Sequence, residues 1–228
     1  MLQVLHDPVM DVLNADFFAD FFCLAADRLE EKRHALCALD GAIGDGDHGS
    51  SMAGGFAAIT RALRQQNPTS AAEVMRIAAQ AFLSEVGATV GPLYASGFLE
   101  AGRRLQGAEP LGPGQFGLFL AGCAEGIQQR GQAAPGDKTM LDVWLPAAQA
   151  AQRAASAGAG PAEIARLTAA TARSACENTA ALISLRGRAA RLQDRSIGHI
   201  DPGAASGAVV IEALCDTVLS RLRHAGST

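Results

Sequence analysis

Apolar side chains recur along this chain at the spacing of an α-helix. Met52, Phe56, Ile59 and Leu63 stand at i, i+4, i+7 and i+11, and a segment that begins at Phe116 repeats the pattern. Such spacing aligns the apolar side chains on one face of a helix. Alanine and leucine are abundant, whereas valine, isoleucine and aromatic residues are comparatively sparse, which favours helix over sheet. The sequence therefore predicts an all-α protein.

Glycine, proline and polar clusters divide the chain into eight predicted helices. Ser70 is a suitable N-cap for the third, and Pro92 and Pro161 suit the first turn of the fourth and the seventh. The predicted ranges are 16–39, 48–65, 70–85, 92–105, 116–129, 139–155, a helix that opens at 161, and 202–223. Elements this short and regular favour an antiparallel eight-helix bundle or barrel. No linker separates two domains, so residues 1–228 are predicted to form one domain.

Charge and cysteine usage narrow the class of protein. The net charge is −4, which argues against a general nucleic-acid-binding protein. The five cysteines are scattered and odd in number, so we interpret them as small buried hydrophobic residues in a reducing compartment. No signal peptide is recognised at the N-terminus, and no run of 18 uncharged apolar residues suggests a membrane span. We therefore expect a cytoplasmic protein.

The stretch Asp40–Ser51, with the sequence DGAIGDGDHGSS, gathers three aspartates among glycines between two predicted helices. The like charges of Asp40, Asp45 and Asp47 repel one another unless a cation lies between them. Mg²⁺ prefers such oxygen ligands together with phosphate and water. An EF-hand is a competing interpretation, but its spacing and its distal glutamate are missing. A solvated loop with aspartate as a helix cap is the other alternative.

The same stretch opens the second predicted helix. His48, Gly49, Ser50 and Ser51 form its first turn, where backbone N–H groups have no partner within the helix. Such a turn attracts phosphate, because the N–H groups and the positive end of the helix dipole face the anion. The pattern therefore predicts a phosphate site beside the predicted metal site.

Three further glycine-bearing loops carry polar residues. In Val86–Gly97, Thr89 offers a hydroxyl, although this stretch is also typical of a tight turn. In Gly136–Trp144, Asp137 is either an N-cap or a ligand-binding residue, and Met140 is either a core residue or a wall against an adenine ring. The stretch Arg186–Ser206 is expected to be a long polar connection with four arginines, which form either a phosphate clamp or a surface patch.

Taken together, these stretches resemble the L-subunit family of dihydroxyacetone kinases. The matching pieces are DGAIGDGDHG, GPLY, GDKTMLDVW, GRA, RSIGH and DPGAAS, which follow the family's order over nearly the full length. The resemblance implies an eight-helix barrel that binds ATP or ADP at one end, with two Mg²⁺ ions held by Asp40, Asp45 and Asp47. It implies that the nucleotide contacts His48, Gly49, Ser50, Ser51, Thr89, Val90, Gly131, Met140, Arg188, Asp201, Pro202 and Gly203.

Two positions depart from the family's pattern. Val90 stands where a small hydroxyl residue is common, so a hydrogen bond to phosphate is expected to be missing. Arg191 stands where an aromatic residue is common, which is expected to alter the lip of the pocket.

The function that the resemblance implies is phosphoryl transfer to a short ketose. The acceptor would be held on a separate K subunit, so this chain alone would be inactive. Such transfer needs mainly positioning and charge neutralisation, and no nucleophile–base pair is evident in the sequence. The resemblance leaves open whether the donor is free ATP or a phosphotransferase protein that recharges bound ADP. A nucleotide-sensing regulatory module that binds a transcription factor is an alternative, and a structural bundle with a degenerate site is another.

Overall fold

The computed structural model describes residues 13–87, 89–106 and 113–225, and within these ranges the chain is helical with no strand. The helices are α1 (Ala15–Ile43), α2 (His48–Gln66), α3 (Ala71–Glu85), α4 (Val90–Leu105), α5 (Pro113–Gly131), α6 (Leu141–Ser156), α7 (Pro161–Asn178) and α8 (Pro202–Ala225), with the short 3₁₀-helices η2 (Thr179–Ala181) and η3 (Arg188–Ser196) between α7 and α8. The predicted all-α class is confirmed.

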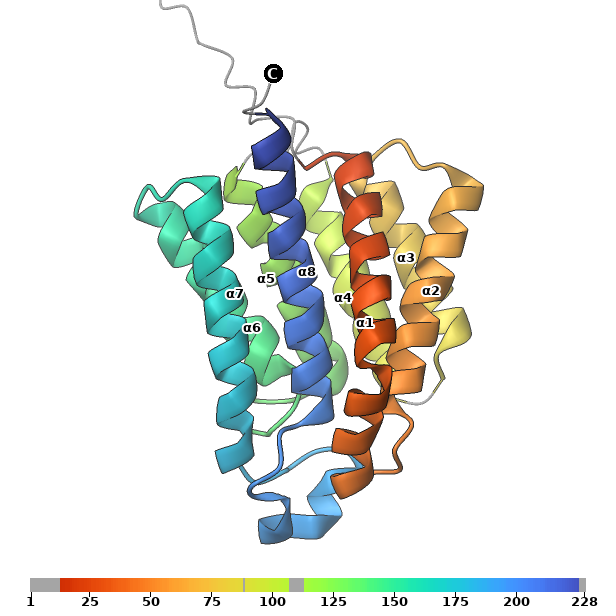
Figure 1. Cartoon of the computed structure of the whole chain (residues 1–228), viewed down its shortest axis with the longest axis vertical. Coiled ribbons are helices and arrows are strands. Elements are labelled where there is room, and N and C mark those ends of the chain that lie inside the picture. The colour runs from red at the N-terminus through yellow and green to blue at the C-terminus, as the bar shows by residue number, and fades with distance from the viewer. Residues whose placement is uncertain (1–12, 88, 107–112, 226–228) are drawn as a thin grey trace, which may run out of the picture.

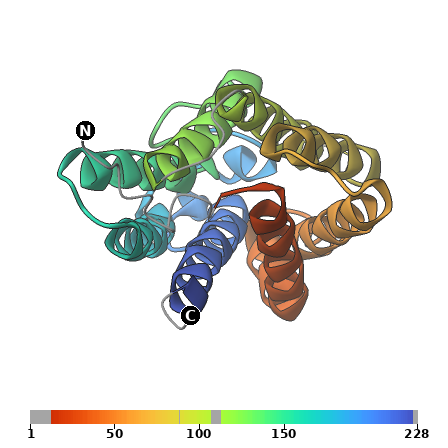
Figure 2. The same ribbon diagram turned by 90° about the horizontal axis from the view of Figure 1, so that it is seen from above.

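The eight α-helices form a closed antiparallel ring. Each helix contacts the next in the chain, and α8 contacts α1 to complete the circuit, as Figure 2 shows from above. Neighbouring helices run in opposite directions along the barrel (Figure 1). This alternation brings the N-termini of α2, α4, α6 and α8 to the same end, where η3 also lies. One end of the barrel therefore carries the positive ends of four helix dipoles, which alternate with the negative ends of the other four.

Aromatic side chains fill the interior of the ring. Phe22, Phe56, Phe82 and Phe98 are fully buried, and Tyr94 is 1% exposed. The rings of Phe22 and Phe98 meet edge to face, with centroids 5.3 Å apart and planes at 86°. Edge-to-face pairs add to the stabilisation that burial of the rings already provides. Because these side chains occupy the middle of the barrel, a ligand has room only at its end.

The helix boundaries follow the sequence signals with small shifts. The Ser70 side chain accepts a hydrogen bond from the Glu73 N–H, so it is the N-cap of α3 as predicted. Proline opens α7 at Pro161, also as predicted. By contrast, α1 continues four residues beyond the predicted end to Ile43, and α4 begins two residues before Pro92.

The long polar connection predicted before the last helix contains the short 3₁₀-helix η3. The predicted loop over 106–115 falls largely outside the described residues. All five cysteines are free, and three of them are buried. One helix segment, Pro202–His224, is long and apolar enough to cross a membrane by composition, but 67% of its apolar window is buried in the barrel.

Candidate functional site

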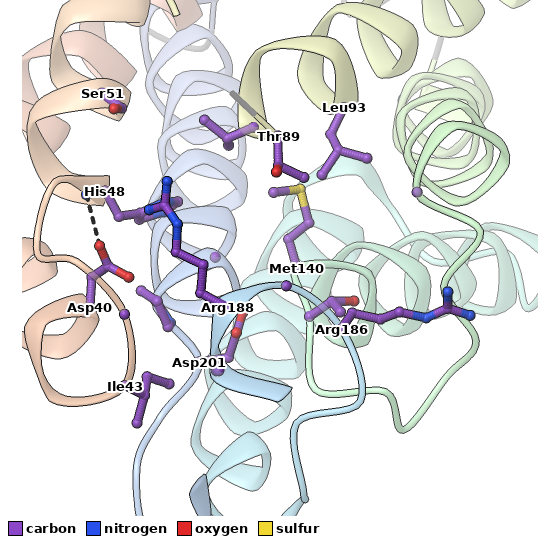
Figure 3. Close-up of a pocket in the computed structure, with 18 of the residues that line it drawn as sticks. Asp40, Ile43, His48, Ser51, Thr89, Leu93, Met140, Arg186, Arg188 and Asp201 are labelled. Atoms are coloured by element: carbon purple, nitrogen blue, oxygen red, sulfur yellow. Dashed lines mark hydrogen bonds between the residues drawn. The ribbon is translucent and has the colours of Figure 1, made fainter. Parts of the chain in front are cut away.

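A cavity of about 320 Å³ opens at the end of the barrel where α2, α4, α6 and α8 begin. Figure 3 shows Asp40 and His48 on one side of it, Thr89, Leu93 and Met140 on the other, and Arg188 between them. Every predicted site residue lines this cavity except Gly49 and Ser50. Stretches that are 160 residues apart in the sequence thus meet at one place, because alternate helices start there.

The three aspartates of the glycine-rich loop converge. One carboxylate oxygen each from Asp40, Asp45 and Asp47 lies within 4.8 Å of the others. Asp40 is buried at the end of α1, while Asp45 and Asp47 are exposed. Gly46 has φ +80°, a left-handed conformation that glycine adopts without strain, and it lets the loop turn back between the two exposed aspartates.

Asp40 has a structural task as well as a place in the cluster. Its Oδ2 accepts hydrogen bonds from the backbone N–H groups of Asp47 at 3.0 Å and His48 at 3.2 Å. Asp47, the N-cap residue of α2, makes no capping bond with its own side chain. Asp40 therefore caps α2 from the preceding helix. This leaves the N–H groups of Gly49 and Ser50 in the first turn without partners inside the helix.

The donor set of this cluster fits a hard divalent cation. Three carboxylates within reach of one point supply the oxygen ligands that Mg²⁺ prefers. Among the described residues, Arg188 is the only one with a positive side chain paired to these carboxylates, and its guanidinium forms an ion pair with Asp45. One cation cannot balance three carboxylates, so the cluster retains excess negative charge.

Gly49 packs the second helix against the first. A Cβ at this position would lie 2.1 Å from the carbonyl oxygen of Arg33 in α1, so only glycine allows this approach. Ser50 is exposed, and its hydroxyl lies 3.7 Å from the Cys37 sulfur. Gly49 has no side chain and that of Ser50 faces Cys37 of α1 and solvent, so only the backbone groups of these two residues remain available at the start of α2.

His48 connects the starts of two helices. Its Nε2 lies 2.8 Å from the Ser206 hydroxyl of α8. Burial lowers the pKa of His48, and the nearby charges of Asp40 and Asp47 oppose that effect. The imidazole is therefore neutral at pH 7, where it accepts or donates one hydrogen bond at each nitrogen. It fixes the first turn of α2 against the second turn of α8.

The wall opposite the carboxylates is mainly apolar. Val90 and Leu93 come from α4, Ile127 from α5, and Met140 from the residue before α6. Met140 is 6% exposed, so it belongs to the core and also lines the cavity. Leu93 and Ile127 were not singled out in the sequence, because apolar residues at helical spacing look like ordinary core positions. A charged end and an apolar end suit a ligand that has both an anionic tail and a flat ring.

Asp201 precedes α8 at the base of the cavity. Its Oδ2 accepts a hydrogen bond of 2.7 Å from the Ala204 N–H, and its own N–H donates to the Thr179 hydroxyl. Burial raises the pKa of Asp201 to about 7, although the Ala204 bond and the charge of Lys138 counteract the shift. Pro202 and Gly203 follow in the first turn, so their backbone borders the cavity.

The loop before α6 has a different capping residue from the one considered in the sequence. Asp142 accepts hydrogen bonds from the N–H groups of Gly136 at 2.5 Å and Thr139 at 2.8 Å. Asp137 instead accepts from the Ala134 N–H and from Arg186, each at 2.9 Å. These bonds lower the pKa of Asp137. The N-cap interpretation of Asp137 was therefore wrong, and its side chain holds Arg186.

The ring of antiparallel helices, with a pocket among the N-termini of four of them, places this chain among all-α barrel domains. The chain belongs to the DAK2 domain family, whose model matches residues 42–216. The resemblance found in the sequence is thereby confirmed.

Several relatives are kinase subunits. The ADP-binding subunit DhaL of PEP-dependent dihydroxyacetone kinase 1 from Listeria innocua is 36% identical over 194 residues, which are 85% of this chain and 92% of that protein. The ADP-binding subunit DhaL of the PTS-dependent dihydroxyacetone kinase from Lactococcus lactis is also 36% identical, over 192 residues, 84% of this chain and 92% of that protein. The dihydroxyacetone kinase of C. freundii, solved with AMP-PNP and Mg²⁺, matches the fold with a TM-score of 0.68 at 24% identity, over 95% of this chain and 37% of that one.

Proposed function

We propose that this chain is the nucleotide-binding phosphotransfer subunit of a kinase for dihydroxyacetone or a similar short ketose. The observation that carries the proposal is one cavity in which three carboxylates, four helix N-termini and an apolar wall meet. The ADP-binding subunits among its relatives support the same ligand class. The nucleotide would place its base against Leu93, Ile127 and Met140 and its phosphates at the starts of α2 and α8.

The residues of the cavity would act by positioning and by charge. Asp40, Asp45 and Asp47 would hold two Mg²⁺ ions, which when bound neutralise phosphate oxygens and align the terminal phosphoryl group. The first-turn N–H groups of α2 would donate to phosphate, and Arg188 would add a forked cationic donor. Phosphoryl transfer requires little more of a protein than this arrangement.

The acceptor would be presented by a separate substrate-binding K subunit that meets the open end of the barrel. The donor would be either free ATP or a phosphotransferase protein that recharges ADP in place. Purified protein that retains ADP would support the second donor. We place the subunit in the cytoplasm, because its five cysteines are all free, as is usual in a reducing compartment.

Calorimetry with ADP tests the proposal. We expect binding that depends on Mg²⁺ and that is lost in Asp45→Asn and Asp47→Asn, because each variant removes a predicted metal ligand. Asp27→Asn is the matched control, since Asp27 is exposed in the middle of α1 and does not line the cavity. ADP affinity that is equal with and without Mg²⁺, or equal in the cluster variants and the control, would contradict the proposal.

A further inference from the structure

The polar stretch of residues 182–198, here called the arginine-bearing segment, lies across the site end of the barrel, beyond the ends of the ring helices (Figure 1). It presents Arg186 and Arg188 to the cavity. Within it only Ser184 and Ser196 are buried, and Ile183, Leu185 and Ile197 are exposed. Apolar burial therefore contributes little to its placement, and polar contacts must hold it.

One buried ammonium group joins the two ends of this segment. Lys138 is 1% exposed, and its Nζ donates hydrogen bonds to the carbonyl oxygens of Leu182 at 3.1 Å and Ser196 at 2.6 Å. The neighbouring contacts are the Ser184 N–H to Ser196 Oγ bond at 2.9 Å and the Leu185 N–H to Asp137 carbonyl bond at 3.0 Å. Among the described residues, only Lys138 has a charged side chain that bonds to both ends of the segment.

Both the backbone conformation of Lys138 and the burial of its charge are unfavourable. Its φ is +59°, in the left-handed region that a residue with a side chain rarely adopts. Burial lowers its pKa, although the carboxylate of Asp201 opposes that shift. Such features persist where the surroundings fix them, and they concentrate at functional sites.

Lysine is also the residue type that suits two carbonyl acceptors at this position. The chain has only two lysines among 19 basic residues, and the other, Lys32, is exposed on α1. A compact ammonium with three donors can satisfy two carbonyls that approach from different directions, whereas a guanidinium is a planar fork. Arginine would therefore not replace Lys138 here.

We propose that Lys138 is a positioning residue that fastens both ends of the arginine-bearing segment and thereby holds Arg188 at the cavity beside Asp45. The Arg186–Asp137 bond and the Gly198 N–H bond to the Ala180 carbonyl also hold this segment, and Lys138 adds a buried charge between its two ends. This fastening requires no bound ligand. Its consequence for ligand binding rests on the proposed function, because the nucleotide is the ligand that Arg188 would contact.

Limited proteolysis with trypsin tests the fastening without any ligand. In Lys138→Met, cleavage after Arg188, Arg191 and Arg195 should be at least tenfold faster than in the wild type, while helix content by circular dichroism is unchanged. Lys32→Met is the matched control and should be cleaved at the wild-type rate. Equal cleavage rates in Lys138→Met and the wild type would overturn the proposal.

The ADP affinity tests the consequence. Arg188→Ala should weaken ADP binding about tenfold through loss of a charged hydrogen bond, and Lys138→Met should weaken it to a similar extent. The double variant should bind no more weakly than Arg188→Ala alone, which a merely structural lysine would not produce. Additive losses would contradict positioning through Arg188. A wild type that binds no ADP would refute the proposed function, and the proteolysis result would still stand.

Lys138→Gln covers the case in which the methionine variant does not fold. The amide keeps a donor for one carbonyl, so its cleavage rate should lie between those of the wild type and a fully released segment. If both variants lose the whole barrel, the proposal is overturned, because Lys138 would then stabilise the barrel rather than the segment.

Discussion

Asp40 is expected to contribute to stability as well as to ligand binding, and one pair of variants separates the two. Asp40→Ala removes a carboxylate that accepts two N–H bonds at the start of α2. Asp47→Ala removes a carboxylate from the same cluster, but one that makes no capping bond. Both variants relieve the repulsion within the cluster, and both leave the ion pair of Arg188 with Asp45 intact. The cap is therefore the main contribution to stability that the two variants do not share.

The magnitude follows from the capping bonds. Replacement of an N-cap acceptor by alanine costs about 0.5–2 kcal/mol. The Asp40 carboxylate is largely buried and accepts two such bonds, which places the cost toward the upper part of that range. For a chain of this size, 1 kcal/mol shifts the Tm by roughly 2–4 °C. Without ligand, Asp40→Ala should therefore melt about 2–8 °C below Asp47→Ala.

Differential scanning calorimetry gives the two Tm values, and titration of ADP with Mg²⁺ gives the two affinities. Both variants should bind ADP more weakly than the wild type, because each lacks one of the three carboxylates. If the ligand-free Tm values coincide, the two N–H bonds do not stabilise α2 and the reasoning on Asp40 is wrong. If Asp40→Ala melts lower yet binds as tightly as the wild type, Asp40 is a cap alone.

Three further results are expected. Gly49→Ala should destabilise the protein by about 1–3 kcal/mol in urea unfolding, because the new Cβ would meet the Arg33 carbonyl and force α1 and α2 apart; an unchanged midpoint would refute the close approach. Val90→Ser should tighten ADP binding roughly two- to tenfold by calorimetry, since a net hydrogen bond contributes about 0.5–1.5 kcal/mol; unchanged affinity would mean that no phosphate lies there. For Asp201, whose pKa of about 7 lies above its ordinary 3.8, the folded protein holds a proton that the unfolded chain releases, so the contribution of Asp201 to wild-type stability falls as pH rises from about 4 to 7 and then levels off. Asp201→Asn should lack this contribution, so its ligand-free stability relative to the wild type should rise over that window, and a constant difference would rule out the raised pKa.

The sequence predicted the helices well because their signals are local. The apolar spacing of α2, the Ser70 cap and the Pro161 start each depend on a few neighbouring residues, and each appears where expected. The closure of the ring is not a local feature: it was predicted from the family resemblance and the helix lengths, and the helix contacts confirm it.

The site could be predicted only in part, because its contacts join distant segments. Asp40 was recognised as a candidate ligand, but its hydrogen bonds to the start of α2 depend on how the loop folds back. The apolar wall at Leu93 and Ile127 had no signal that separates it from core. Lys138 lies in the motif GDKTMLDVW, but its role could not be predicted, because its partners lie 44 and 58 residues further along the chain.

The even number of helices in the ring has a consequence for how the protein can be handled. A chain that crosses the barrel eight times returns to the side on which it started, so α1 begins and α8 finishes far from the cavity (Figure 1). The 24 residues of α8 span about 36 Å. A fluorophore, an affinity tag or a fused polypeptide attached beyond either helix would thus leave the mouth of the pocket unobstructed, and surface immobilisation through such an attachment would present that mouth to the solution.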